Sequence, residues 1–324
     1  MKTITHGISI RGISAAVPEK TIENISSIEK FREKKVKMRL KITGIERRHI
    51  AKEGQDAKDL CFSAAKRLLD YMNIDKDQIS TLIFVTQTPS FVIPSTSFWI
   101  HDQLGLSKHC IVYDINLGCS GFVEGLNAVA SVMQSQEIGN KGLLLNADTI
   151  SKYIDCEDEA TSMIFGDAGT ATLLERTEED DFICWHCVDS EQYRDIFVKT
   201  PEHKLIMDGM QVFSYTLEQV VGQINNLLHE RNNYEFYLLH QAQKYIVDNV
   251  SSLCGLPQEK VLTSYEEYGN TSGASIPLTM CNNRKCFSPE KNYSILVSGF
   301  GAGLSCASAA VTLRNPEIID IAVL

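Results

Sequence analysis

Short apolar runs alternate with helical patterns along most of the chain. In the first half, apolar residues at spacings of three and four separate runs that are typical of buried strands. The run 110–115 is one such strand, and Phe122, Leu126 and Val129 mark the helix after it. The elements expected in this half are a helix at 61–69, a strand at 82–87, a helix at 95–104, a strand at 110–115, a helix from 119, and strands at 142–147 and 169–174.

The second half repeats this order of elements. Helices that alternate with short β-rich runs predict parallel strands covered by helices on both faces. We therefore expect a duplicated α/β fold with halves at 1–176 and 177–324, joined by a charged surface connection at 175–181. The elements expected in the second half are a helix at 212–230, a strand at 236–239, a helix at 244–253, a strand at 260–263, a helix from 270, and strands at 293–298 and 305–313.

Length and charge narrow the possible functions. The chain has 324 residues, of which 44% are hydrophobic and 22% charged, as is usual for a soluble globular protein. A net charge of −10 argues against nucleic-acid binding. No apolar run reaches the roughly 18 residues of a membrane helix, so we expect no membrane partner. The one basic stretch, 34–41, predicts a helix with either a solvated face or a docking patch for an anionic partner.

The ten cysteines have no regular spacing. The N-terminal segment has no long apolar core. The irregular spacing of the cysteines and this N-terminal segment together predict free thiols in a reducing cytoplasm. Cys184 and Cys187 have the spacing of a redox or metal pair, but they lie in an expected strand and no second pair offers a matching half-site. We expect no metal site.

Cys119 lies where the strand 110–115 meets the helix that follows it, between Gly118 and Gly121. A thiol at this junction meets the free N–H groups of the first helical turn and the positive end of the helix dipole, which both favour thiolate. The small neighbours would let a substrate carbonyl approach the sulfur. The alternative is a small buried thiol with no chemical role.

Two further residues occupy strand-to-helix junctions. His240 follows the strand 236–239, and Asn270 follows the turn 266–269 at the position that corresponds to Cys119 in the other half. Taken alone, His240 would be a core histidine and Asn270 a helix N-cap. Because strand ends of an open α/β sheet face one cleft, the three can converge there. A Cys could then carry an acyl group as a thioester, while His and Asn donate hydrogen bonds to a carbonyl oxygen that becomes negative.

Three segments around these residues resemble the active-site motifs of the β-ketoacyl-acyl-carrier-protein synthase III family. They are 114–122, 239–242 and 268–278, and further similar segments extend the resemblance from Thr43 to Val311. The resemblance implies a thiolase-like fold of five layers, α-β-α-β-α, and a homodimer. It also implies a decarboxylative Claisen condensation, in which a Cys-bound acyl group and a malonyl thioester give a β-ketoacyl thioester.

The resemblance also implies roles for individual residues. Cys119 would carry the acyl group, and His240 and Asn270 would stabilise the malonyl enolate. The backbone N–H groups of Cys119 and Ala302 would form the oxyanion hole. The substrates would be coenzyme A or acyl-carrier-protein thioesters, with acyl carrier protein as partner and no tightly bound cofactor. Binding residues implied in the same way are Phe165, Phe213 and Phe300 in the pocket wall and Ile93 at the tip of a loop that enters the neighbouring subunit.

The sequence departs from the family at the expected coenzyme A contacts. The stretch 38–42 has no Trp, and Glu159 stands where the family has a phosphate-binding Arg. Tyr245 replaces a docking Arg, with Lys244 beside it. The acyl donor and the acyl chain therefore stay open, and so does the choice between housekeeping fatty-acid synthesis and a specialised pathway. Two other functions remain as alternatives: an acyltransferase to an alcohol or amine, and a non-catalytic partner subunit.

Overall fold

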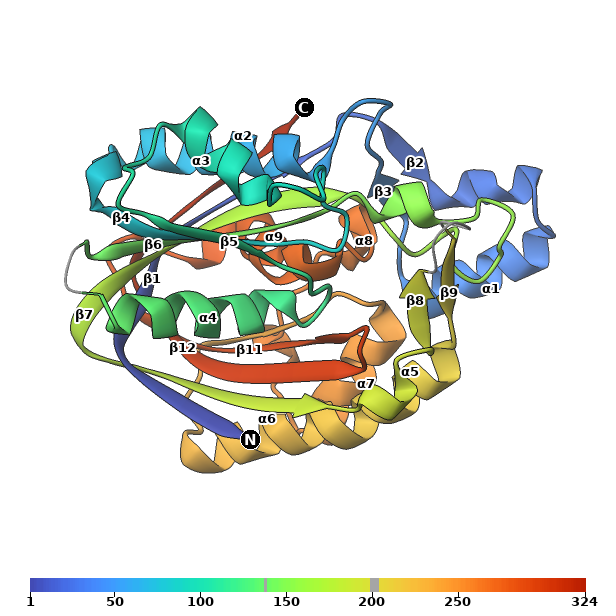
Figure 1. Ribbon diagram of the computed structural model, residues 1–324. Coiled ribbons are helices and arrows are strands. Elements are labelled where there is room, and N and C mark those ends of the chain that lie inside the picture. The colour runs from blue at the N-terminus through green and yellow to red at the C-terminus, as the bar shows by residue number, and fades with distance from the viewer. Residues whose placement is uncertain (137–138, 199–203) are drawn as a thin grey trace.

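The protein folds into alternating layers of helices and sheet. The computed structural model describes residues 1–136, 139–198 and 204–324. In Figure 1, helices α2 (Ala57–Tyr71) and α3 (Thr96–Leu104) form the top layer, and α6 (Val221–Glu230) and α7 (Lys244–Leu253) lie at the bottom. Helices α4 (Gly121–Gln134) and α9 (Ser275–Asn282) lie between the two layers of strands. The five-layered α/β fold expected from the sequence is confirmed.

Each half contributes parallel strands closed by one antiparallel strand. In the first half, β5 (Ile111–Ile115), β4 (Ile79–Val85) and β6 (Lys141–Asp148) are parallel, and β7 (Ala168–Val188) is antiparallel to β6. In the second half, β10 (Phe236–Leu239) and β11 (Tyr293–Gly301) are parallel, and β12 (Ser305–Val323) is antiparallel to β11. Strand β1 (Lys2–Val17) lies between β12 and β7, so all eight strands are connected.

Three apolar clusters match the three helical layers. The central cluster contains Phe122, Leu126 and Met133 of α4 together with Ile276 and Met280 of α9. Together with Val129 of the same cluster, the residues of α4 follow at spacings of three and four, and those of α9 at a spacing of four. A helix between two sheets must bury more than one face, and most side chains of both helices are buried. A second cluster lies under α2 and α3, and a third under α6 and α7. The core therefore holds α4, and Cys119 two residues before it, in a fixed place.

The segment 175–181 is a correction to the sequence interpretation. It was expected to be a surface connection, but β7 runs through it without interruption. Its charged side chains have partners: Glu175 pairs with Arg11 and Lys141, and Asp180 with Arg314. Since β7 pairs with β6 at one end and β12 at the other, it belongs to both sheets. The division at residue 176 remains a prediction.

Other elements differ from the expectation in smaller ways. The expected strand at 260–263 is wrong: Gln258–Lys260 is a 3₁₀ helix, and Val261 forms only an isolated bridge with Tyr237. The expected helix at 212–230 is divided by a π-helical turn, Thr216–Val220. Among the described residues, no helix is long and apolar enough to cross a membrane. The remaining elements are α1 (Glu33–Thr43), α5 (Gly209–Tyr215), α8 (Tyr265–Tyr268), and the short strands β2 (Thr21–Glu23), β3 (Arg47–His49), β8 (Ile196–Val198) and β9 (Leu205–Met207).

Candidate active site

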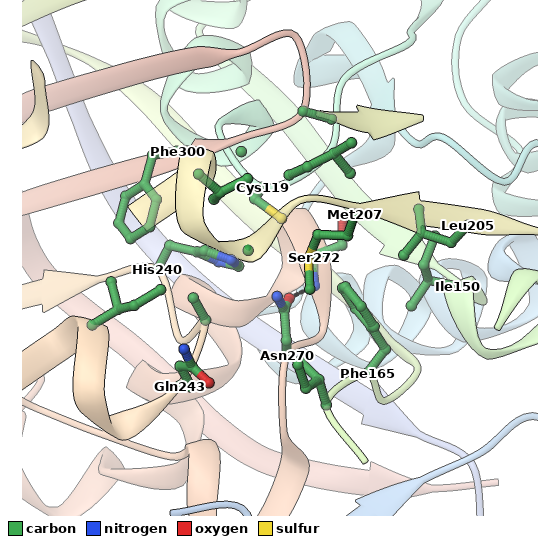
Figure 2. Close-up of a pocket in the computed structure, with 18 of the residues that line it drawn as sticks. Cys119, Ile150, Phe165, Leu205, Met207, His240, Gln243, Asn270, Ser272 and Phe300 are labelled. Atoms are coloured by element: carbon green, nitrogen blue, oxygen red, sulfur yellow. Dashed lines mark hydrogen bonds between the residues drawn. The ribbon is translucent and has the colours of Figure 1, made fainter. Parts of the chain in front are cut away.

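One pocket gathers residues that the sequence singled out in both halves of the chain. Cys119, His240 and Asn270 all line it, and their side chains point toward a common space in Figure 2. Its empty volume is about 710 Å³, including the part open to solvent. A largely apolar wall with a few convergent polar groups is typical of a small-molecule site. The wall includes the expected Phe165, Phe300 and Ala302, and also Ile150, Ile164, Leu205, Met207, Val212 and Ile246.

Cys119 lies between the end of β5 and the start of α4, as expected. The end of β11 passes directly beside it: a Cβ added to Gly301 would stand 2.7 Å from Cys119 Cβ and 3.1 Å from Sγ. Only a glycine lets the backbone come this close to the sulfur. Ala302 follows Gly301 in the chain. In the part of the chain that the structure describes, neither the N–H group of Cys119 nor that of Ala302 donates to a backbone carbonyl. They are therefore available to a ligand beside the sulfur.

One side of the Cys119 side chain lines the pocket, and the rest is surrounded by protein. Burial raises the pKa of Cys119 to about 12, and the carboxylate of Asp148 acts in the same direction. Hydrogen bonds from Ser272 and Asn270 lower that pKa without offsetting the burial. Helix α4 begins only at Gly121. Burial thus favours the neutral thiol of Cys119 over the thiolate that was expected from the helix terminus.

His240 is held at the end of β10 by main chain and side chain together. Its N–H donates to Ser298 O at 2.8 Å, and its Nδ1 lies 2.7 Å from Ser275 Oγ. The edge of its ring meets Phe300, with centroids 5.3 Å apart. Burial lowers the pKa of His240 to about 3, so the imidazole is neutral at physiological pH. Ser275 Oγ accepts a hydrogen bond from Gln241 N–H at 3.4 Å, so its own proton is available to donate to His240 Nδ1. In the neutral ring the proton then lies on Nε2, and His240 can donate it to a ligand.

Asn270 is fixed by the segment that contains Phe165. Asn270 N–H donates to Ile164 O at 2.9 Å, and Gly166 N–H donates back to Asn270 O at 3.0 Å. The side-chain Oδ1 accepts a hydrogen bond from Ser272 N–H at 2.9 Å, which orients the Nδ2 donor group away from Ser272. Ser272 takes a left-handed backbone conformation with φ of 54°. A non-glycine residue in this region is uncommon and often belongs to a functional site.

The sequence interpretation missed a buried carboxylate near Cys119. Asp148 Oδ1 accepts hydrogen bonds of 2.8–3.1 Å from the side chains of Thr86 and Thr88 and from the N–H groups of Gln87 and Thr88. Burial raises the pKa of Asp148 to about 6. The network fixes the 86–88 turn, from which the Gln87 side chain lies against Gly118. An Asp at the end of an apolar strand was the only signal in the sequence.

Two of the expected binding residues lie elsewhere. Phe213 packs on Tyr245, with ring centroids 5.2 Å apart, and lines a separate surface hollow, whereas its neighbour Val212 lines the pocket. The assignment of Phe213 to the pocket wall was therefore wrong for this chain. Ile93 is 89% exposed in the isolated chain and does not reach this pocket.

The cysteines outside the site form no disulfide, and all ten are free thiols. His186, between Cys184 and Cys187, has its Nδ1 3.0 Å from the Glu124 carboxylate and its Nε2 2.9 Å from Thr3 Oγ1. Within the described ranges, no group of three or more His, Cys, Asp or Glu side chains is placed to hold a metal ion.

Similar proteins support the same interpretation. Residues 113–190 match the family described as 3-oxoacyl-[acyl-carrier-protein (ACP)] synthase III, and residues 229–313 match its C-terminal part. A β-ketoacyl-[acyl-carrier-protein] synthase III of Clostridium perfringens is 32% identical over 323 residues, which cover 93% of this chain and 98% of the relative. The synthase III of Lactococcus lactis subsp. lactis is 30% identical over 324 residues, covering 94% and 98%.

Solved structures agree along nearly the whole chain. A 3-oxoacyl-(acyl-carrier protein) synthase of Burkholderia xenovorans superposes with a TM-score of 0.96 at 33% identity, covering 100% of this chain and 99% of the other. The synthase III of Pseudomonas aeruginosa gives 0.84 at 26% identity, covering 97% and 100%. With Cys119, His240 and Asn270 in one pocket of this fold, the chain belongs to the β-ketoacyl-acyl-carrier-protein synthase III family.

Proposed function

We propose that this protein condenses a Cys119-bound acyl group with a malonyl thioester and releases a β-ketoacyl thioester. The observation that carries the proposal is the convergence of a thiol, a neutral imidazole and a primary amide in one largely apolar pocket. A thiol can accept an acyl group, and two neutral donors can stabilise an enolate without protonating it. An acyltransferase to an alcohol or amine would have no use for this second pair of donors.

In the first step, Cys119 Sγ attacks the carbonyl carbon of an acyl thioester. The carbonyl oxygen becomes negative and accepts hydrogen bonds from the N–H groups of Cys119 and Ala302. The bond between carbonyl carbon and donor sulfur then breaks, and the proton of the Cys119 thiol is transferred to the departing thiol. Because burial raises the pKa of Cys119, we expect the proton to leave during the attack and not before it.

In the second step, the malonyl thioester loses CO₂. The electron pair of the breaking carbon–carbon bond enters an enolate, whose oxygen accepts hydrogen bonds from His240 Nε2–H and Asn270 Nδ2–H. The enolate carbon attacks the acyl carbon on Cys119, and the collapse of the tetrahedral oxyanion releases the Cys119 sulfur. The thiolate then takes up a proton, which restores the starting enzyme.

A two-stage reaction tests this function on the wild-type enzyme. Incubation with an acyl thioester alone is expected to add one acyl mass to the protein, as measured by intact-mass spectrometry. Malonyl-acyl-carrier protein should then remove that mass and yield a β-ketoacyl-carrier protein of the corresponding length. An acyl adduct that is transferred to an alcohol or amine, with no new carbon–carbon bond, would contradict the proposal.

A homodimer in a reducing cytoplasm is part of this proposal. The loop before α3 exposes Phe91, Val92 and Ile93, with 91% of Val92 and 89% of Ile93 accessible in the isolated chain. Adjacent exposed apolar residues of this size mark an interaction site. In a dimer, the loop would be covered, and Ile93 would help to close the acyl pocket of the neighbouring subunit. Ten unpaired thiols support a reducing compartment.

Light scattering at micromolar concentration is expected to give the mass of a dimer. Ile93→Ala should shift the preference among acyl chain lengths, because it enlarges one end of the neighbouring pocket. The matched control is Ile28→Ala, an exposed isoleucine outside this loop, which should leave the preference unchanged. A monomer in solution, or an Ile93→Ala enzyme with wild-type chain preference, would contradict the respective part of the proposal.

A further inference from the structure

A hollow outside the catalytic pocket contains a buried arginine. Its wall comes from the segments 22–31, 48–50 and 151–162, and the described residues that line it are all different from those around Cys119. Its empty volume is about 780 Å³, including the part open to solvent. Arg48 of β3 belongs to the wall although only 6% of the residue is accessible, and Ile22 of β2 lies opposite it in the strand pairing. We call this site the Arg48 hollow.

The charge of Arg48 is not neutralised by an ion pair. Its Nε donates a hydrogen bond to Asn24 Oδ1 at 2.7 Å and its Nη1 donates to Phe165 O at 3.0 Å, and both acceptors are neutral. Among the described residues, the remaining nitrogen, Nη2, has no acceptor, and no carboxylate is paired with the guanidinium. Arg48 therefore has one unused donor and a full charge in the wall of the hollow.

Asp167 attracts Arg48 but does not bind it. The Asp167 carboxylate accepts hydrogen bonds from Ser151 Oγ at 2.5 Å and from the N–H groups of Ala51 and Ser151 at 2.7 and 3.0 Å. Burial lowers the pKa of Arg48 to about 10 against the attraction of Asp167, so the guanidinium stays charged at neutral pH. A buried charge is costly unless an opposite charge and hydrogen-bond partners come close to it. An anion in the hollow would supply both.

Other polar groups of the wall also favour an anion. The hydroxyl oxygen of Ser162 is buried and has no hydrogen-bond partner among the described residues, so it can donate to a ligand. Lys30 adds a second cation; its Nζ lies 3.2 Å from Glu157, and half of its side chain is accessible. The one acidic residue in the described wall, Glu29, is exposed to water. Two cations thus face one solvated carboxylate, and the balance attracts negative charge.

The remaining part of the wall is apolar. Its side chains are half-buried and belong to Ile22, Phe31, Ile50 and Ile154. An inorganic ion would leave these side chains in contact with water. An apolar group attached to the anion would cover them, and the burial of apolar area would add to the affinity.

We propose that the Arg48 hollow binds a small organic anion, namely a carboxylate or a phosphate monoester that carries a short apolar group. The anionic head would accept hydrogen bonds from Arg48 Nη2 and the Ser162 hydroxyl, and the apolar group would pack against the isoleucines and Phe31. The site is distinct from the one that takes the thioester substrates. It is connected to the catalytic pocket because Arg48 binds Phe165 O, and Phe165 forms a β-bridge with Asn270.

Isothermal titration calorimetry at constant ionic strength tests the site on the full-length enzyme. The probes are pentanoate, butyl phosphate and inorganic phosphate. At least one of the two organic anions is expected to bind about tenfold or more tightly than inorganic phosphate, which has no apolar group. The tighter of the two organic probes shows whether the head group is a carboxylate or a phosphate. The inference is overturned if neither organic anion binds, or if inorganic phosphate binds as tightly as both.

Two variants place the bound anion. Ser162→Ala should weaken the binding of the tighter probe by about tenfold, because a hydrogen bond to a charged group is lost, whereas Ser252→Ala on α7 should have no effect. Lys30→Gln should weaken it several-fold, and the matched control is Lys66→Gln, since Lys66 is also an exposed lysine in an ion pair. An anion that binds equally well to Ser162→Ala and Lys30→Gln lies elsewhere, for example beside Cys119, and this result would contradict the proposal.

Arg48→Gln removes the buried charge itself and should abolish binding. This change also removes hydrogen bonds to Asn24 and Phe165, so thermal unfolding of the variant is measured alongside the titration. If the variant does not fold, Ser162→Ala decides, because Ser162 Oγ has no partner in the described part of the chain that its removal would disturb. A folded Arg48→Gln protein that binds the anion with wild-type affinity would overturn the assignment.

Discussion

Replacing Cys119 by alanine is expected to abolish the acyl-enzyme adduct completely. Cys119 is the only thiol among the described residues that line the pocket. Since the alanine variant loses one atom that faces the pocket, its free energy of unfolding should fall by no more than about 1 kcal/mol. Intact-mass spectrometry after incubation with an acyl thioester measures the adduct, and thermal unfolding measures the fold.

The matched control is Cys286→Ala, which removes an exposed thiol far from the pocket lining. It should load as the wild-type enzyme does. Undiminished labelling of the Cys119→Ala protein would falsify the assignment of the nucleophile.

The second large effect is expected for Asn270→Ala. This variant should still form the acyl-enzyme, but malonyl decarboxylation and condensation should slow by about 10²–10³-fold, the usual loss when one preorganised donor to an oxyanion is removed. The reason is that the Nδ2 group of Asn270 faces the pocket, while Oδ1 is occupied by Ser272 N–H. Separate assays of acyl loading and of CO₂ release measure the two half-reactions.

The Asn270→Asp variant separates the loss of the Nδ2 donor from the loss of the hydrogen bond that Asn270 accepts from Ser272 N–H. A carboxylate keeps an oxygen for Ser272 N–H but offers no donor to the enolate, so this variant should be as slow in condensation as Asn270→Ala. If acyl loading collapses in either variant while malonyl decarboxylation proceeds at the wild-type rate, the role of Asn270 is wrong.

The sequence predicted elements well where periodicity was decisive. Helix α4 was expected because Phe122, Leu126 and Met133 repeat at helical spacing, and these residues do fill the central cluster. The run at 260–263 was misassigned because a short apolar segment has the same pattern in a strand as in a buried turn. The middle of β7 looked like a loop because its charges are paired by residues far away in sequence, such as Arg11 and Arg314.

In the site, too, the features that depend on the local sequence were predicted, and those that depend on residues far away in the sequence were not. Cys119 and His240 were recognisable because each stands between the end of a strand and the next helix, and Asn270 because it follows a turn and precedes a helical segment. The protonation state of Cys119 was not, because it depends on burial and on Asp148, a residue 29 positions further along the chain. Likewise, the orientation of Asn270 depends on the unusual backbone of Ser272, and the sequence pattern does not reveal this.

The uninterrupted course of β7 has a consequence for motion. One end of this strand pairs with β6 of the first half and the other end with β12 of the second. A hinge between the halves would have to break these main-chain hydrogen bonds, so the enzyme cannot close around its substrates as two rigid lobes. We therefore expect Cys119 and Asn270, which lie on either side of β7 in the sequence, to keep their spacing during the reaction. The β8–β9 ribbon, whose described strands pair with each other and not with the large sheet, also contributes Ile196, Leu205 and Met207 to the pocket wall.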